Sequence, residues 1–295
     1  MQKRIREVVK RVFDRRKLTD YGPVELGSHK TKHDSEVLGI ATKKLVTVTK
    51  TTSIKNATEL MAKNGIRRMP VVDPGTKRLV GIFTARDILD FLGGGKKANL
   101  VRDNIRKSIN TPVGKIMGAR VQTIPDNFTI RQTVDFFRKN DISGAPIVDK
   151  QRIVKGMITE RDLVRLTAGV PAGIKVEQAM SKKTTTSTPG VSISDLAKIM
   201  MRNDFRRLPV VSDDRIVGMV TSMDIIRVIA NNKIFGQDLR VEDIMVTNPI
   251  TVQPGLDIGE LAKLSVQKRI GAFPVASRER LVGLITEHDI LKAVV

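Results

Sequence analysis

Four pairs of a threonine and an aspartate, each three residues apart, are the side chains of this 295-residue sequence best suited to bind a ligand. The pairs are Thr84 with Asp87, Thr159 with Asp162, Thr221 with Asp224, and Thr286 with Asp289. A carboxylate at the start of a helix can accept two hydrogen bonds from a ribose diol, while a nearby hydroxyl and the helix-terminal N–H groups favour phosphate. The pattern therefore makes each pair a candidate nucleotide site.

The same pairs also have a purely structural interpretation. An aspartate in the first turn of a helix caps that helix and stabilises it by about 1 kcal/mol without any ligand. From the sequence, both interpretations stay open for every pair.

The pairs belong to a unit that recurs four times. Each copy ends in a glycine, two apolar residues, the threonine and the aspartate, as in Gly81-Ile-Phe-Thr84-Ala-Arg-Asp87. A proline that heads an apolar run lies 15 to 17 residues before the aspartate, and another threonine lies 38 to 40 residues before it. The prolines are Pro70, Pro146, Pro209 and Pro274, and the upstream threonines are Thr47, Thr123, Thr186 and Thr251. Three anchors kept in four copies indicate a repeat architecture.

The elements that must position these residues can be predicted from the third copy. Ile193, Leu196 and Met200 have helical spacing. Pro209-Val-Val and the apolar run 215–220 are β-prone and joined by a turn, which predicts a hairpin. The aspartate then starts a second helix. With a short β-prone run around the upstream threonine, the predicted unit is β-α-β-β-α.

This unit resembles the CBS domain in element order, in the Gly-to-Asp ending and in the tandem count, and the resemblance covers residues 36–295. CBS domains fold as pairs. The resemblance therefore implies an α+β fold, with four β-α-β-β-α CBS repeats arranged as two paired modules (1 with 2, 3 with 4) and a basic N-terminal helix. The predicted divisions are 1–35 for the basic helix and extension, 36–95 for CBS 1, 96–111 for a basic linker, 112–170 for CBS 2, 171–232 for CBS 3 and 233–295 for CBS 4. Copies two to four begin with Val-x-x-[Ile/Ala]-Met, at Val113, Val176 and Val241, and the first copy lacks this lead-in.

The resemblance also implies a ligand. In CBS pairs, residues at the Thr–Asp positions line clefts that hold AMP, ADP, ATP or similar adenosyl ligands, so an adenine nucleotide is implied as a regulatory ligand and no cofactor is required. The upstream threonines would border the adenine or ribose, and Arg86, Arg161 and His288 would lie near a phosphate. The third copy has Met223 at this place, which makes it the weaker phosphate site. A homodimer through the CBS modules is a further implication.

The charge of the chain points to a second kind of partner. Fifty-two Lys and Arg against 31 Asp and Glu leave a net charge of +21 and a pI near 10.4. Residues 1–111 carry 25 basic and 11 acidic side chains, whereas residues 232–295 carry 8 of each. A thermophile surface is one explanation, but such surfaces usually balance the two signs in ion-pair networks. An uneven excess instead predicts a polyanion such as nucleic acid, bound through its phosphates.

Two basic regions are the predicted RNA-binding surface. In the N-terminal segment, Ile5, Val8, Val12 and Phe13 predict an amphipathic helix whose other faces are basic. Such a helix can dock on the CBS body, on a partner protein or on an anionic membrane surface. The predicted RNA contacts are Lys3, Arg4, Arg6, Lys10, Arg11, Arg15, Arg16 and Lys17 in this helix, and Lys96, Lys97, Arg102, Arg106 and Lys107 in the linker.

Several classes of chemistry are poorly supplied. The chain has no cysteine and three histidines, so disulfides, thiolate chemistry and histidine-rich metal sites are not expected. No nucleophile–base pair, P-loop or paired acids stand out, which predicts a protein that is not an enzyme. No secretory signal and no apolar run long enough to span a bilayer is visible, which predicts a cytoplasmic location.

Three functions are consistent with these patterns. The leading hypothesis is a regulator that binds ribosomal RNA or ribosomal subunits and inhibits translation, modulated by adenine nucleotides. Among archaeal proteins with four CBS domains, the chain resembles ribosome-associated hibernation factors in architecture and charge. The alternatives are an adenine-nucleotide energy sensor that regulates an enzyme or transporter, and a DNA-binding regulator, although no helix-turn-helix is evident.

Overall fold

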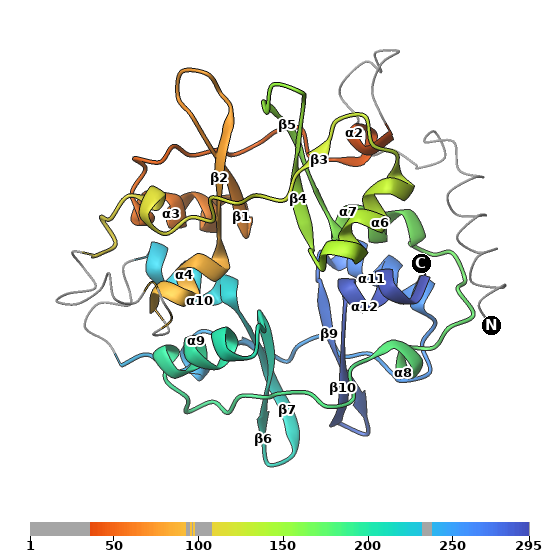
Figure 1. Ribbon diagram of the computed structural model, residues 1–295. Coiled ribbons are helices and arrows are strands. Elements are labelled where there is room, and N and C mark those ends of the chain that lie inside the picture. The colour runs from red at the N-terminus through yellow and green to blue at the C-terminus, as the bar shows by residue number, and fades with distance from the viewer. Residues whose placement is uncertain (1–35, 93–94, 96, 98–107, 232–237, 295) are drawn as a thin grey trace.

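The four repeats form the four quarters of a flat disc (Figure 1). The computed structural model describes residues 36–92, 95, 97, 108–231 and 238–294. The predicted basic helix at the N-terminus and most of the 96–111 linker lie outside these residues.

Each repeat has the predicted order of helix, hairpin and helix. Repeat 1 consists of α3 (Ile54–Asn64), β1 (Arg68–Val72), β2 (Leu79–Thr84) and α4 (Ala85–Leu92). Repeat 2 consists of β3 (Ile124–Pro125), α6 (Ile130–Asn140), β4 (Gly144–Val148), β5 (Val154–Thr159), α7 (Glu160–Val164) and η3 (Arg165–Thr167). Repeat 3 consists of α9 (Ile193–Arg202), β6 (Arg207–Ser212), β7 (Arg215–Thr221) and α10 (Ser222–Ala230). Repeat 4 consists of α11 (Ile258–Lys268), β9 (Ala272–Ser277), β10 (Arg280–Thr286) and α12 (Glu287–Val294).

The first predicted strand of each repeat is short. It pairs in parallel with the hairpin through Val48, Ile124, Ser187 or Val252, each of which directly follows an upstream threonine. Only in repeat 2 is it long enough to count as a strand, β3. The predicted CBS architecture is confirmed, with the first element reduced to a single bridge in three repeats.

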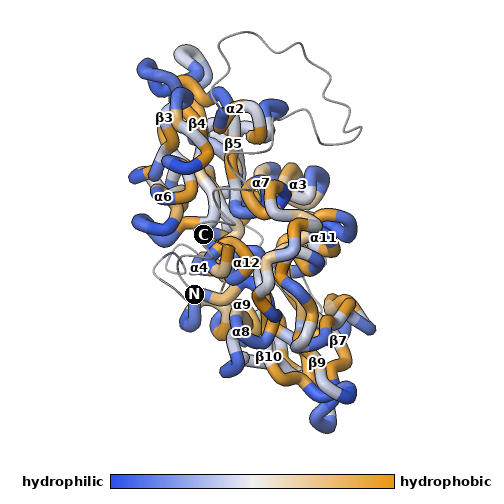
Figure 2. Tube along the Cα trace, turned by 90° about the vertical axis from the view of Figure 1, so that its right-hand side faces the viewer, coloured by the Kyte–Doolittle hydropathy of each residue, from blue (hydrophilic) through white to orange (hydrophobic). Residues whose placement is uncertain are grey.

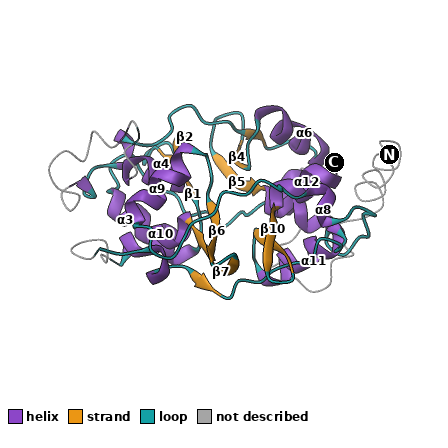
Figure 3. Cartoon of the chain, turned by 90° about the horizontal axis from the view of Figure 1, so that it is seen from below, coloured by secondary structure: helices purple, strands orange, loops and turns teal. Residues whose placement is uncertain are grey.

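The hairpins meet along the middle of the disc, and the helices lie outside them (Figure 3). The turns of repeats 1 and 2 touch through the bridge between Arg78 and Ile153, and those of repeats 3 and 4 through the bridge between Arg215 and Arg280. Repeat 1 thus pairs with repeat 2 and repeat 3 with repeat 4, as the predicted modules require.

The helices bury their apolar faces across the modules rather than within them. Helix α10 packs against α3 and α4 packs against α9, so repeats 1 and 3 share one core. Helix α12 packs against α7, and repeats 2 and 4 share a second core. Figure 2 shows hydrophobic stretches along the helices and strands, and hydrophilic stretches at most of the turns between them. Each core contains side chains from both modules, so neither module holds a complete core alone.

The lead-in segments are exchanged within each module. The lead-in of repeat 2, with η2 (Val113–Lys115), docks on β2, where Ile82 and Gly118 exchange two backbone hydrogen bonds of 2.9 Å. The lead-in of repeat 3, with α8 (Val176–Ala179), docks on β10, and that of repeat 4, with η4 (Val241–Asp243) and β8 (Val246–Thr247), docks on β7.

The first repeat has a lead-in after all, which corrects the interpretation from sequence. Helix α2 (Glu36–Ile40) places Val37 at the position of the other lead-in valines, and all four valines are fully buried. Ala41 then takes the place of the methionine, and Thr42 exchanges backbone hydrogen bonds with Met157 of β5. The motif was missed because its last residue is alanine.

The glycine of the repeat ending makes room for the lead-in methionine. A Cβ at Gly81 would lie 2.5 Å from Sδ of Met117 and 3.1 Å from the Gly118 carbonyl oxygen. At Gly156, where Ala41 replaces methionine, the nearest atom would be the Ala41 Cβ at 3.4 Å, an ordinary contact.

We therefore expect Gly81→Ala to destabilise the protein by about 1–3 kcal/mol through overpacking. Gly156→Ala, the matched control, should change the free energy of unfolding by less than about 0.5 kcal/mol. Urea unfolding followed by circular dichroism measures both. Equal effects at the two positions would contradict the role assigned to the methionine.

Candidate functional site at the Thr–Asp pairs and the disc centre

Each of the four Thr–Asp pairs forms a helix cap. In repeat 2, Oδ2 of Asp162 accepts hydrogen bonds from the Thr159 backbone N–H at 2.9 Å and from the Thr159 hydroxyl at 2.7 Å. The other three pairs make the same two bonds at 2.7 or 2.8 Å. The structural interpretation of the pairs is thus realised in every repeat, and it uses only one of the two carboxylate oxygens.

The second oxygen distinguishes the repeats. In repeat 1, Oδ1 of Asp87 is ion-paired with Lys97, and in repeat 3, Oδ1 of Asp224 accepts from Arg227 at 2.7 Å. Oδ1 of Asp162 and Oδ1 of Asp289 have no hydrogen-bond or ion-pair partner among the residues that the structure describes. Only repeats 2 and 4 therefore offer an uncommitted carboxylate oxygen to a ligand.

Asp162 is the more deeply buried of these two carboxylates. It is 9% exposed, and burial raises the pKa of its carboxyl above the usual range, against the lowering effect of the Thr159 hydrogen bonds. A ligand hydroxyl that donates to Oδ1 would stabilise the ionised form.

In each repeat the first hairpin strand lies between the upstream threonine and the Thr–Asp cap. Each upstream threonine precedes the residue that bridges in parallel to that strand, while Thr84 and its equivalents end the second strand. Their side chains make no hydrogen bond within the described parts of the chain. The structure therefore keeps both threonines of a repeat on one sheet but separates them by a strand.

Strand register brings the four caps to the disc centre. The first residue of each hairpin lies opposite the cap threonine: Arg68 opposite Thr84, Gly144 opposite Thr159, Arg207 opposite Thr221 and Ala272 opposite Thr286. At this position repeats 1 and 3 have an arginine, and repeats 2 and 4 have a glycine and an alanine. A Cβ at Gly144 would collide with the Arg68 guanidinium, and a Cβ at Gly271 would lie 2.6 Å from Nη2 of Arg207, so these two glycines leave the space that the arginines fill.

Ionisable side chains from all four repeats, together with Ser143, meet here and form what we call the central cluster. Its members are Arg67, Arg68, Ser143, Glu160, Arg161, Arg206, Arg207, Glu287 and His288. Ser143 Oγ accepts from Arg68 at 2.9 Å and from Arg206 at 3.0 Å, which joins repeats 1, 2 and 3. Sequence reasoning missed the cluster as a unit, because its members come from four separate segments.

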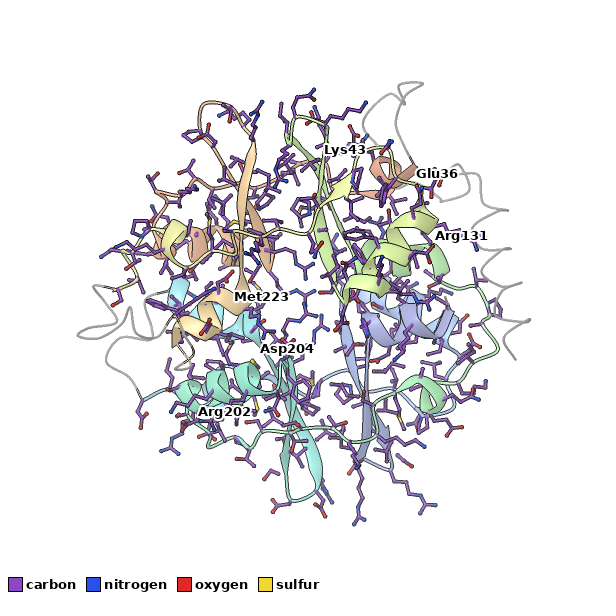
Figure 4. All side chains as sticks on the ribbon, viewed as in Figure 1. Glu36, Lys43, Arg131, Arg202, Asp204 and Met223 are labelled. Atoms are coloured by element: carbon purple, nitrogen blue, oxygen red, sulfur yellow. The ribbon has the colours of Figure 1, made fainter. Side chains whose placement is uncertain are left out.

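Two ion pairs cross between repeats 2 and 4. Arg161 Nε donates to Glu287 at 2.6 Å, and Nδ1 of His288 lies 2.7 Å from Glu160. Each pair joins a residue next to one open aspartate with the glutamate that starts the opposite helix. The predicted phosphate contacts Arg161 and His288 therefore also connect the two modules. The third predicted contact, Arg86, is ion-paired with Asp204, and Figure 4 shows Asp204 and Met223 toward the middle of the disc.

The arginines of the cluster are crowded. Burial lowers the pKa of Arg67 to about 10, helped by the charge of Arg206. Burial also lowers the pKa of Arg68 and of Arg207 to about 9, again with repulsion from neighbouring arginines. The cluster therefore holds more positive charge than its own glutamates compensate.

Most of the predicted RNA contacts lie outside the described residues. These are Lys3, Arg4, Arg6, Lys10, Arg11, Arg15, Arg16, Lys17, Lys96, Arg102, Arg106 and Lys107. Lys97 is described, and its ammonium is paired with Asp87. Their role in RNA binding stays a prediction.

The described residues hold no cluster of three or more His, Asp or Glu side chains able to bind a metal ion. Every helix in them is too short or too polar to cross a membrane.

Comparison with known proteins agrees with the fold. The profile of the CBS domain matches residues 35–94, 113–169, 176–231 and 241–295. The uncharacterized protein MJ1225 of Methanocaldococcus jannaschii is 38% identical over 266 residues, which are 85% of this chain and 95% of that protein. The crystal structure of MJ1225 is described as that of a proposed archaeal homologue of g-AMPK. It superposes on this chain with a TM-score of 0.82, and the match covers 88% of this chain and 100% of the MJ1225 chain.

Two more distant relatives cover most of the chain. An uncharacterized 33.4 kDa protein in a ribosomal RNA operon of Thermofilum pendens is 24% identical over 245 residues, or 78% of this chain and 81% of that protein. An uncharacterized conserved protein of Pyrococcus horikoshii is 22% identical, and its crystal structure matches this chain with a TM-score of 0.58. The match covers 88% of this chain and 99% of the other chain, so the two share the fold.

The His288–Glu160 pair predicts a pH-dependent contribution to stability. The hydrogen bond that His288 donates to Glu160 raises the pKa of His288 above 6.5, against the effect of partial burial. Because the native pKa is the higher one, the contribution is present in full below pH 6.5 and is lost as the pH rises through the native value. The His288 side chain is 51% exposed, so solvent screening limits the effect to about 1 kcal/mol or less.

We expect His288→Gln to be less stable than the original protein at acidic pH and equally stable at alkaline pH. Chemical unfolding at a series of pH values measures the difference. In a Glu160→Gln background the same substitution should lose this pH dependence. A difference that persists unchanged in that background would assign it to another group.

Proposed function

The chain belongs to the CBS domain family, and from that premise we propose that it is a non-enzymatic adenine-nucleotide sensor that regulates a partner enzyme or transporter. The observation that carries the proposal is the uncommitted Oδ1 of Asp162 and of Asp289, each at a capped helix start. A carboxylate oxygen in this place suits a ribose hydroxyl, and the cation next to it in sequence, Arg161 or His288, suits a phosphate.

The two remaining repeats are less suited to a nucleotide. Lys97 and Arg227 neutralise the aspartates of repeats 1 and 3, and a ribose there would have to displace an ion pair. Repeat 3 also has Met223 at the position of the phosphate-facing cation. The proposal therefore assigns two nucleotides to each chain, in repeats 2 and 4.

The same residues supply a route from binding to regulation. A phosphate that draws Arg161 away from Glu287, or His288 away from Glu160, would exchange a contact between modules for a contact with ligand. Nucleotides with different numbers of phosphates would do so to different extents. The relative arrangement of the modules would then report the nucleotide state to a partner.

Calorimetric titration with AMP, ADP and ATP tests the assignment. We expect two sites per chain, and Asp162→Asn or Asp289→Asn should each weaken one site by about tenfold or more. Asparagine keeps an acceptor for the cap but removes the charge, so the fold should be retained. Asp224→Asn is the matched control, since its second oxygen already binds Arg227, and it should leave both sites unchanged.

An equal loss in Asp224→Asn would contradict the assignment to repeats 2 and 4. The absence of binding by all three nucleotides would contradict the sensor function itself.

Nucleic acid is the second candidate, favoured by a difference between the two hairpin edges of the disc. The turns of repeats 1 and 2 carry five exposed cations, Lys77, Arg78, Lys150, Arg152 and Lys155, against Asp73 and Asp149. The equivalent turns of repeats 3 and 4 carry three of each sign, Arg215, Arg278 and Arg280 against Asp213, Asp214 and Glu279. The first edge, formed by the turns of repeats 1 and 2, has the net positive charge that binding to a phosphate backbone requires. The second edge, formed by the turns of repeats 3 and 4, has no net charge.

Backbone conformation adds to this difference. Lys77 and Arg152 lie in the left-handed region, at φ 57° and 62°, where glycine or asparagine is less strained. Of the four left-handed residues on the other edge, three are acidic. The Thermofilum pendens relative comes from a ribosomal RNA operon, which makes ribosomal RNA the first nucleic acid to test and inhibition of translation the first consequence.

Charge reversal on the two edges tests this candidate. Lys77→Glu with Arg152→Glu should weaken binding of a structured ribosomal RNA fragment and reduce the salt slope by about 1 for each phosphate that the variant no longer neutralises. Arg215→Glu with Arg280→Glu, on the other edge, should have a much smaller effect. Fluorescence anisotropy over a range of salt measures both. Equal effects of the two double variants would leave the first edge without a special role.

A further inference from the structure

The second edge of the disc carries charges that are balanced in sum but separated in space (Figure 1). Arg215 of one turn and Glu279 of the other are paired, with 4.0 Å between Nε and Oε2. Four charged side chains remain, all exposed and without an ion-pair partner among the described residues: Asp213, Asp214, Arg278 and Arg280. The two aspartates form what we call the acidic tip, on the hairpin of repeat 3, and the two arginines form the basic tip, on the hairpin of repeat 4.

The backbone of these turns favours other residues. Each turn has two residues, and all four lie in the left-handed region, at φ 48° and 62° in the acidic tip and at φ 46° and 67° for Arg278 and Glu279. Glycine and asparagine are preferred in such turns. Hairpin formation therefore does not explain charged residues here, and within the described chain only Glu279 has an ion-pair partner. The free charges are suited to a contact outside the chain.

Exposed apolar side chains lie close to the same edge. Val246 is 55% and Ile250 39% exposed, and they are two of the three large apolar side chains exposed in the described part of the chain. Both belong to the segment that leads from β8, paired with β7, to Val252, which bridges to β9. Packing of a repeat does not require apolar residues there, because the equivalent residues of repeats 2 and 3 are glycine or polar: Gly118, Gln122, Ser181 and Thr185.

Charge decides which partner fits this edge. A polyanion gains nothing from a surface without net charge. The acidic tip of one copy, however, complements the basic tip of a second copy, and a two-fold axis normal to the disc brings both such pairs together. Two chains of net charge +21 also repel each other least when they approach through their uncharged ends. The first edge, with its excess of cations, repels its own copy.

We propose that the second edge binds a second copy of this chain, in an end-to-end dimer with a two-fold axis normal to the disc. Each acidic tip contacts the basic tip of the other copy, and the two segments with Val246 and Ile250 meet on one face of the seam. Apolar contacts flanked by charged ones are typical of protein interfaces.

The dimer leaves the rest of the molecule unchanged. The helix faces shared between the modules stay within each chain, and Asp162 and Asp289 take no part. The two basic first edges lie at opposite ends of the dimer. The proposal is therefore independent of both functions proposed above.

Sedimentation equilibrium of the full chain over a range of concentrations tests the proposal. The mass should rise from 32.7 kDa toward twice this value as the concentration increases. Asp213→Lys with Asp214→Lys makes both tips basic, and Arg278→Glu with Arg280→Glu makes both acidic. Each double variant should raise the Kd of the dimer by about tenfold or more, because attraction at both pairs of tips becomes repulsion.

A mixture of the two double variants separates tip pairing from a general effect of charge. Every tip of one variant then meets a tip of opposite charge on the other, so an equimolar mixture should form the dimer again. Lys77→Glu with Arg152→Glu is the matched control, since it lies on the first edge and changes the net charge as much as Arg278→Glu with Arg280→Glu. The control should retain the dimer.

The apolar contact is tested separately with Ile250→Gln, which introduces the residue that repeat 2 has at the equivalent position. The variant should weaken the dimer by about fivefold or more through loss of apolar burial, with the thermal midpoint of the monomer unchanged.

Three outcomes would overturn the proposal. These are a chain that stays monomeric up to about 1 mM, a dimer that survives in both double variants, and a mixture of the two that remains monomeric. Nucleotide binding by a chain that stays monomeric would leave the sensor function in place.

Discussion

Crowding at the disc centre is the constraint that orders the rest of the molecule. Four copies of one unit bring the first residue of a hairpin and the start of a helix to the same place, and there is room for large side chains from only two of them. Arg68 and Arg207 occupy that room, and Gly144 and Gly271 leave it open because they have no side chain. Glu160 and Glu287, at the helix starts of the other two repeats, then supply the negative charge that partly balances the arginines. Alternation of the four copies is thus a packing requirement.

Capping and ligand binding are compatible because they use different atoms of one side chain. Oδ2 of each repeat aspartate serves the helix, so the carboxylate is oriented before any ligand arrives. Oδ1 is not used by the cap, and its partner differs between the repeats: Lys97 in repeat 1, Arg227 in repeat 3 and none among the described residues in repeats 2 and 4. A protein built from similar units can in this way keep its architecture in all four while specialising only two.

What the sequence could predict follows the range of the interactions. The repeat, its β-α-β-β-α order and the caps rest on neighbours within a few residues, and spacing alone predicts them. The lead-in of the first repeat was missed because it ends in alanine where the other copies have methionine, and only the pairing of Thr42 with Met157, more than a hundred residues away, identifies it. The partners of Oδ1 and the central cluster depend likewise on contacts among distant segments, which no local pattern encodes. The charge excess predicted a polyanionic partner, but not where on the surface it would bind.

The sharing of cores between modules has a consequence for ancestry. A half-length chain with two repeats would leave the outer faces of its helices bare, and a second copy of itself is the surface that would cover them. The simplest precursor is therefore a two-repeat polypeptide that was stable only as a homodimer, followed by fusion of its two genes.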